Sequence, residues 1–390
     1  MDQIAMIDKV IEKMHAWSKG SWERATAVEA ELEYNHPAFT PFSPQGAPKP
    51  NTLPPILLSI VKQILSERPT EEQFPQGKGL ILVEDGAAGD PASLGTHCLT
   101  VANHLSMLSE ADYGLDSAEE WKLMHDLQIA AIQEMRFLLE HAPKTEDGAI
   151  SHRIGHVSLW ADFIYMVPPF MATYALSFPA KDNSAYGSSG PKVYLDQAYN
   201  QCRLHRQYLK KPTSGLWRHI VLGGEKVGGD RKVDPWAWST SNGWVAAGLI
   251  RTRQIFLQSP NAAQMESETE DLLHWTLEIM DETVKHQTPS GMIRTYIDEE
   301  HMPEESCGTA LLAYVGFRLA TIRGKRDDYI PFALRARDAV LAKVDPASGA
   351  LTQVCDICDE RMMREQSAEG QAFVVLMEAA HRDWKALQSE

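Results

Sequence analysis

Apolar residues recur at helical spacing along most of the chain, and the strict two-residue alternation of strands is scarce. Residues 2–19 form the first such stretch, with apolar side chains three or four positions apart. Further helical stretches are predicted at 56–66, 117–141, 194–209, 268–285 and 331–344. Residues 36–55 are rich in proline, which predicts a loop.

A short turn containing glycine and an apolar residue recurs through the chain. The glycines are 69, 67, 76 and 58 residues apart: Gly79, Gly148, Gly215, Gly291 and Gly349. Each turn is followed by a helix start rich in small residues, at 86–95, 160–169, 242–248, 305–310 and 368–372. These five cycles and an N-terminal helix pair predict about six helix-turn-helix units.

Repetition of this kind indicates one helical architecture rather than separate domains. We expect a single all-α domain over residues 1–390, a toroid of inner helices ringed by outer amphipathic helices. Small residues at the inner starts suit a crowded centre and would leave room for a pocket at the loop end. The alternative is an open α-solenoid, although these units are longer and less regular than common solenoid repeats.

Acidic residues outnumber basic ones by 53 to 37, which gives a net charge of −16. Without a basic surplus, nucleic acid and anionic membrane surfaces are disfavoured as partners. A small anionic substrate stays compatible, because a local site can be basic on an acidic protein. No apolar run reaches the length of about 18 residues typical of a membrane span, and the acidic N-terminal stretch does not resemble a signal peptide.

The five cysteines are few and odd in number, so they do not predict a secreted disulfide framework. Cys355 and Cys358 form a C-x-x-C, but two incidental thiols are favoured over a redox or zinc pair, because no second such pair completes a zinc site. No metal or organic cofactor is signalled. We expect a cytoplasmic protein, and the oligomeric state stays open.

One acid, Asp162, lies within the apolar and aromatic run from residue 159 to residue 172. A carboxylate among apolar neighbours is costly unless it is hydrogen-bonded, protonated or used in chemistry. We take Asp162 as the candidate chemical centre. The alternative is a helix-capping or otherwise structural acid.

Four blocks resemble one family. The run Trp160-Ala-Asp162-Phe-Ile-Tyr-Met-Val-Pro-Pro-Phe-Met-Ala172 resembles the W-x-D-x-x-Y/F-M-x-x-P-F-L-A signature of unsaturated rhamnogalacturonyl hydrolases, family 105 of the glycoside hydrolases. Residues 214–219 resemble its G-L-x-x-H turn, residues 238–244 its W-x-R-G-N-G-W block, and residues 305–310 its E-x-S-x-T/S-A helix start. The similarity covers most of residues 80–380 in the right order.

The resemblance implies an (α/α)6 barrel, also called a six-hairpin toroid. It also implies hydrolysis of a terminal 4,5-unsaturated uronic acid by hydration of its enol ether, with Asp162 as the proton donor. Apolar surroundings that raise a carboxyl pKa suit this task. Asp85 and Asp90 are candidates for a second catalytic acid, although both also suit turn and cap chemistry.

The candidate substrate-binding residues follow turns or belong to the matching blocks: His219, Trp217, Trp238, Thr240, Asn242, Arg231, Trp160 and His156. Aromatic faces suit sugar C–H surfaces, and we favour Trp217 and Trp238 for the pocket and Trp244 for the core. Loop or packing roles are the alternative for His156. The family arginine of the W-x-R-G-N-G-W block is replaced by Thr240, so Arg231 is a candidate substitute.

Three functions remain open at this point. The first is the unsaturated uronyl hydrolase, acting on a small oligosaccharide. The second is an isomerase or biosynthetic enzyme that reuses Asp162 as a proton donor on another substrate, as the loss of the arginine suggests. The third is a non-catalytic sugar-binding protein.

Overall fold

The computed structural model describes residues 3–43, 50–69, 81–110, 118–177, 190–223, 233–322, 327–355 and 363–389. Within these residues twelve α-helices form: α1 (Gln3–Trp17), α2 (Ser21–Asn35), α3 (Pro55–Glu67), α4 (Asp90–Glu110), α5 (Ala118–Arg136), α6 (Phe163–Ala175), α8 (Lys192–Leu209), α9 (Ser239–Gln258), α10 (Glu266–Lys285), α11 (Ser306–Thr321), α12 (Ile330–Leu341) and α13 (Ala368–Leu387). None of the described helices is long and apolar enough to cross a membrane.

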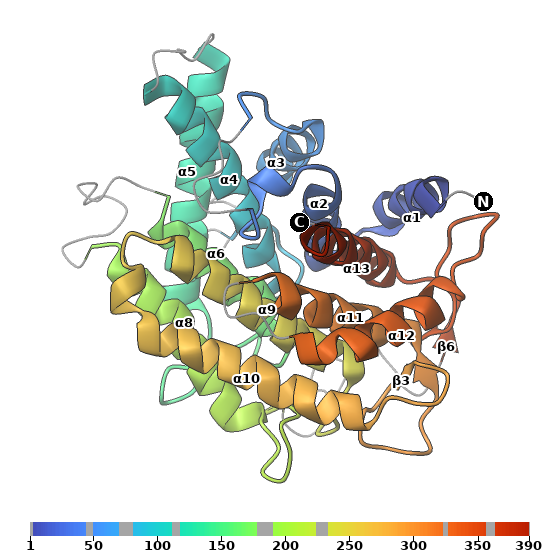
Figure 1. The fold of residues 1–390 in the computed structure, drawn as a ribbon. Coiled ribbons are helices and arrows are strands. Elements are labelled where there is room, and N and C mark those ends of the chain that lie inside the picture. The colour runs from blue at the N-terminus through green and yellow to red at the C-terminus, as the bar shows by residue number, and fades with distance from the viewer. Residues whose placement is uncertain are drawn as a thin grey trace.

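Helices α2, α4, α6, α9, α11 and α13 form an inner ring, in which each packs against the next and α13 closes the ring on α2 (Figure 1). Helices α1, α3, α5, α8, α10 and α12 pack outside this ring. Helices α5, α8, α10 and α12 pack chiefly against the inner helix that precedes each in the chain, α1 packs chiefly against α13, and α3 packs chiefly against α4. The closed ring confirms the all-α toroid of six hairpins and excludes the open solenoid.

Apolar periodicity located the outer helices well, but it missed α2. The buried residues of α2 include Glu29 and Glu33, so the face that this helix turns toward the inside of the protein is partly acidic. Arg251 of α9 and Arg318 of α11 each donate to Glu33 at 2.6 Å. A buried ion-pair network therefore joins three inner helices where an apolar stripe was the expected signal.

The proline-rich stretch 36–55 is not entirely irregular. A short 3-10 helix covers Pro37–Phe39, and α3 begins at Pro55, the first helical position that proline tolerates. Three other short helical pieces are Phe137–His141, Ala262–Gln264 and Asp327–Tyr329. The turn at Gly79 lies outside the described residues.

Helix α6 is buried on every side, with all but Thr173 of its 13 residues buried. Pro168 within it has no N–H to offer to the carbonyl of Ile164, four residues earlier. Gly248 of α9 packs against that carbonyl, since a β-carbon built at Gly248 would lie 2.3 Å from the Ile164 oxygen. Glycine at this position lets the backbones of α6 and α9 approach.

Short antiparallel strand pairs precede the inner helices: β1 (Leu159–Trp160) with β2 (Ile220–Val221), β3 (Ile293–Arg294) with β4 (Glu304–Glu305), and β5 (Val354–Cys355) with β6 (Met363–Arg364). Backbone bridges also join Ile220 to Asp234 and Trp238 to Tyr296. Because each inner helix follows an outer one in a hairpin, these strands and the inner N-termini gather at one end of the barrel. That end holds the candidate site.

Candidate active site

Asp162 lies directly after β1, and the pairing of β1 with β2 brings it beside His219. Trp160 pairs with Ile220, and the Ala161 N–H donates to the His219 carbonyl at 2.9 Å. The Asp162 side chain does not cap α6, although Asp162 is the N-cap residue. Its carboxyl instead accepts a hydrogen bond from Ser241 Oγ at 2.6 Å and lies 3.4 Å from His219 Nε2.

His219 is held between two carboxylates. Its Nδ1 lies 2.9 Å from Asp234 Oδ2, and its Nε2 faces Asp162. Asp234 is buried and also accepts from the Trp236 N–H and the Tyr296 hydroxyl. Because an ionised carboxylate only accepts, Asp234 favours the tautomer with a proton on Nδ1 and leaves Nε2 to exchange a proton with Asp162.

Two tryptophans border this pair. Trp160 is half-buried and stacks on His152 at 4.7 Å between ring centroids, and the Trp160 and His219 rings meet edge to face with 5.6 Å between their centroids. The ring of Trp238 lies 4.6 Å from that of His219. The guanidinium of Arg153 lies over Trp160, 4.9 Å from the ring centroid. The rings of Trp160 and Trp238 therefore lie next to the Asp162–His219 pair, and the Arg153 guanidinium lies on the first of these rings.

The other two predicted acids have separate surroundings. Asp90 begins α4 and lies 3.3 Å from His152 Nε2, so the stacked His152 and Trp160 link it to the Asp162 region. Asp85 accepts from the Ser21 hydroxyl and the Ala87 N–H. Although Asp85 is exposed as a residue, packing that removes water from its carboxyl raises its pKa, and the charge of Asp90 adds to this.

Three expected substrate contacts need correction, because Trp217, Thr240 and Asn242 are completely buried. The Asn242 side-chain amide hydrogen-bonds to the backbone: it accepts from the Trp217 N–H and donates to the carbonyls of Trp217 and Trp238. Thr240 Oγ1 lies 3.4 Å from a carboxylate oxygen of Glu305. These residues hold the loops at the start of α9 and have no free surface for a substrate.

The remaining predicted residues are partly buried, buried in the core, or outside the described residues. His156 is half-buried, and its carbonyl accepts from Ser151 Oγ. Trp238 is 3% exposed, and Trp244 lies in the core as expected. Arg231 lies outside the described residues, as does Cys358, the second cysteine of the C-x-x-C.

Sequence reasoning did not single out Ser241, Asp234 or Glu369. Ser241 occupies the second substituted position of the W-x-R-G-N-G-W block, and only the fold shows that its hydroxyl reaches Asp162. Asp234 follows His219 by 15 residues with no periodic relation to it. An acid in the first turn of the last inner helix was the available signal for Glu369.

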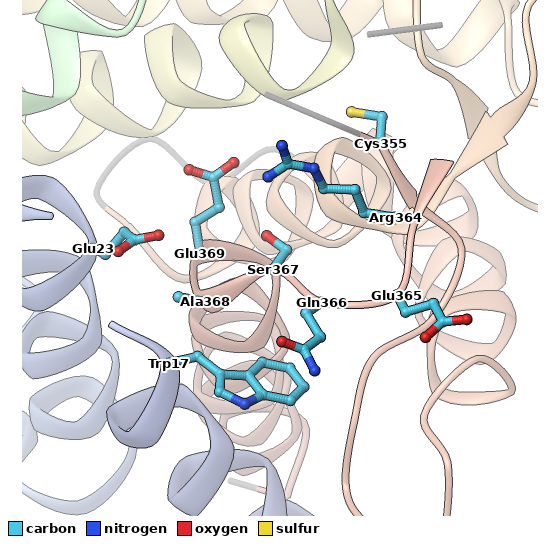
Figure 2. Close-up of a pocket in the computed structure, with 9 residues that line it drawn as sticks. All are labelled: Trp17, Glu23, Cys355, Arg364, Glu365, Gln366, Ser367, Ala368 and Glu369. Carbon is cyan, nitrogen blue, oxygen red and sulfur yellow. The ribbon is translucent and has the colours of Figure 1, made fainter. Parts of the chain in front are cut away.

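Glu369 lines a pocket of about 460 Å³ at the same end of the barrel: Trp17, Glu23, Cys355, Arg364, Glu365, Gln366, Ser367, Ala368 and Glu369 (Figure 2). Burial raises the pKa of the Glu369 carboxyl to about 8, and the charges of Glu23 and Asp162 contribute. The influence of Asp162 shows that the two carboxyls belong to one electrostatic neighbourhood.

The fold has relatives among solved structures. A family 105 glycoside hydrolase from C. acetobutylicum is similar, with 13% identity, a TM-score of 0.62, and 96% of this chain and 99% of that chain covered. A possible family 105 member from Klebsiella pneumoniae has 17% identity and a TM-score of 0.56 over 87% of this chain and 96% of that one.

An unsaturated glucuronyl hydrolase from a Bacillus species, responsible for the degradation of glycosaminoglycan, is also similar. Its identity is 12% and its TM-score 0.53, over 94% of this chain and 85% of that chain. No curated protein matches the chain. At these identities the structural likeness concerns the fold alone.

Family membership has separate evidence. The sequence model of Glycosyl Hydrolase Family 88 matches residues 111–372, about two thirds of the 390-residue chain. The matching region contains Asp162, His219 and Asp234, together with Ser241 and Glu369. The motifs resemble family 105, whereas the model that matches describes family 88. The chain is a glycoside hydrolase that belongs to glycosyl hydrolase family 88.

Proposed function

We propose that this enzyme hydrolyses short oligosaccharides that end in a 4,5-unsaturated uronic acid, with Asp162 as the acid that starts the reaction. The observation that carries the proposal is the arrangement of the Asp162 carboxyl, which receives Ser241 Oγ on one oxygen and faces His219 Nε2 with the other. Its side chain keeps 12% of its surface exposed, enough for contact with a reacting atom.

The chemistry divides between the two residues. Asp162 donates its proton to C4 of the enol ether, which leaves positive charge shared between C5 and the ring oxygen. Water then adds to C5 and returns a proton to the Asp162 carboxylate, and the resulting hemiketal opens and releases the neighbouring sugar. His219, oriented by Asp234, faces the same carboxyl with Nε2 and can accept a hydrogen bond from the Asp162 proton, which holds that proton in place before and after the two transfers.

Arg153 is the candidate for recognition of the uronate carboxylate. Thr240 replaces the arginine of the related motif and is buried against Glu305. The guanidinium of Arg153 lies over the ring of Trp160, which is in edge-to-face contact with His219. A planar guanidinium can bind a carboxylate through two parallel hydrogen bonds. We keep Asp90 as the candidate second acid, with His152 between it and Trp160.

We also propose that the enzyme works in the cytoplasm on imported oligosaccharides, as one domain. The four cysteines among the described residues are free thiols, which fits a reducing compartment. The same Asp162 could instead protonate another substrate in an isomerase or biosynthetic reaction. The replacement of the arginine by Thr240 is the observation that favours this second function.

A panel of unsaturated uronyl disaccharides tests the proposal, because the ring double bond absorbs ultraviolet light and its loss follows the reaction. We expect turnover that falls by about 10²–10⁴-fold in Asp162→Asn, the contribution typical of general acid catalysis. Asp126→Asn is the matched control, since Asp126 forms a surface pair with Lys122 on α5. Absence of turnover across the panel by the wild-type enzyme would reject the proposal in favour of the second function.

A further inference from the structure

The Glu369 pocket has no role in the chemistry above, yet it borders the same site. We propose that it is the subsite for the sugar that the reaction releases, and that Glu369 selects a neutral sugar by hydrogen-bonding one of its hydroxyl groups. This inference rests on the proposed function, because it concerns the second sugar of the same substrate. It assigns Glu369 to substrate selection and leaves the proton transfer to Asp162.

The position of Glu369 supports a ligand contact. The residue is 5% exposed, and among the described residues its carboxyl receives one hydrogen bond, from Trp22 Nε1 to Oε2 at 3.3 Å. A carboxyl group can make several more. Figure 2 shows it directed into the pocket, on the side of the Arg364 guanidinium. A buried polar group with spare hydrogen-bonding capacity at a pocket wall is suited to a ligand hydroxyl.

Trp238 connects this pocket to the Asp162 site. Its indole N–H donates to Cys355 Sγ at 3.3 Å, and Cys355 lines the pocket. The same indole ring lies 4.6 Å from the ring of His219, which faces Asp162. One aromatic side chain therefore touches both the proton-transfer pair and the pocket, as expected when two adjacent sugars occupy the two spaces.

The charges around Glu369 determine what it can bind. Glu23 of α2 lines the same pocket, Glu305 lies at the start of the neighbouring helix α11, Asp162 lies at the start of α6, and Arg364 lies on β6. Loss of water and these acids raise the pKa of Glu369 to about 8. Near pH 7 its carboxyl is therefore mostly protonated, so it can donate one hydrogen bond and accept another.

The same charges disfavour an anionic leaving sugar. Glu23 and Glu365 line the pocket together with Glu369, whereas Arg364 is the one basic residue among the described residues that line it. A sulfate or carboxylate on the released sugar would meet mostly acidic walls, and like charges at close range oppose binding. A sugar that carries hydroxyl groups alone would pair with the neutral Glu369 carboxyl.

Two substrates distinguish the subsite from the reaction itself: an unsaturated uronyl disaccharide with a neutral second sugar, and the methyl glycoside of the unsaturated uronate, which has no second sugar. We expect Glu369→Ala to lower kcat/KM for the disaccharide by about tenfold, the effect of one lost hydrogen bond, through a higher KM. The methyl glycoside should react as with the wild-type enzyme. Glu282→Gln on the surface of α10 is the matched control.

The pH dependence gives a second readout that does not need Glu369→Ala to fold. Wild-type kcat/KM for the disaccharide should fall above about pH 8, as Glu369 loses its proton, and the methyl glycoside should lack this decline. Glu369→Gln stays neutral and should remove the decline. Equal losses on both substrates, or an unchanged decline in Glu369→Gln, would overturn the inference.

The two proposals fail in different ways. If the wild-type enzyme does not turn over the methyl glycoside or any disaccharide, the proposed function is wrong. If it turns over both and the Glu369 variants treat them alike, only the subsite is wrong. A disaccharide with a sulfated second sugar adds a further comparison, for which we expect weaker binding than for its neutral counterpart; tighter binding would contradict the predicted selectivity.

Discussion

Asp234→Asn tests whether His219 works through its tautomer. In the wild-type enzyme the Asp234 carboxylate lies 2.9 Å from His219 Nδ1 and can only accept there. An asparagine has nearly the same shape, but its amide can donate to Nδ1. That exchange moves the ring proton to Nε2, where it would be directed at Asp162. The substitution therefore changes the proton arrangement of His219 and leaves the packing of the site in place.

The expected magnitude follows from the bond that is lost. A hydrogen bond to a charged group contributes about 1.5–3 kcal/mol, and each 1.36 kcal/mol of transition-state stabilisation corresponds to about a tenfold change in rate. The replacement should therefore lower kcat by about 10- to 150-fold. Asp234 does not line the described pocket, so KM should change little.

The assay is the loss of ultraviolet absorbance of an unsaturated disaccharide, with thermal unfolding measured on the same samples. Tyr296→Phe is the matched control, since its hydroxyl donates to the same Asp234 oxygen at 3.3 Å but carries no charge. We expect that variant to keep kcat within about threefold, because the lost hydrogen bond is long and His219 Nδ1 still meets the Asp234 carboxylate, so the tautomer of His219 does not change. A wild-type kcat in Asp234→Asn would refute the role of the His219 tautomer.

Three further predictions concern recognition and stability. Arg153→Ala should raise KM about tenfold or more, and Arg153→Lys should restore only part of the loss, because a lysine cannot bind a carboxylate through two parallel bonds; equal KM values in all three proteins would exclude Arg153 from the site. Glu33→Gln should lower the free energy of unfolding by up to about 3–5 kcal/mol in urea, because the carboxylate shared by Arg251 and Arg318 is lost and these buried cations keep only Glu29 and Asp383, respectively; a change below about 1 kcal/mol would contradict this estimate. Burial raises the pKa of Glu134 to about 8, above its ordinary value of 4.5, so the folded state holds this proton more tightly than the unfolded chain does. That stabilisation is complete below pH 4.5 and is lost as pH rises through 8, so the Tm of Glu134→Gln should decline less than that of the wild type over this range; parallel declines would show that other groups cause the pH dependence.

Much of the fold was readable from the chain itself. The outer helices carry their apolar stripe on one face, so periodicity located them within a few residues, as for α8 and α10. Regularly spaced glycine turns predicted six hairpins, and small residues at the following helix starts indicated a crowded centre. Both are local properties, because they depend on how each segment meets its neighbours in sequence.

The inner ring was less readable, because its helices are buried all round and part of their buried surface is charged. Helix α2 was missed for this reason, since Glu33 is satisfied by arginines 218 and 285 residues further along the chain. A pattern within one helix cannot predict ion-pair partners that lie hundreds of residues away in the sequence. The same limit explains the corrections at Trp217, Thr240 and Asn242, whose residue types suit sugar binding but whose positions lie inside the protein.

The candidate site shows the division most clearly. The sequence alone determined that an acid lies in an apolar run, where a carboxylate is costly unless it is hydrogen-bonded, protonated or used in chemistry. The motif around Asp162 indicated the role of proton donor. Only the tertiary structure decided its surroundings. The pairing of β1 with β2 places His219 beside it, α9 supplies Ser241, a later loop supplies Asp234, and α13 supplies Glu369. The ring brings these distant residues together because its inner helices all begin at one end, and each contributes its first turn to a common space.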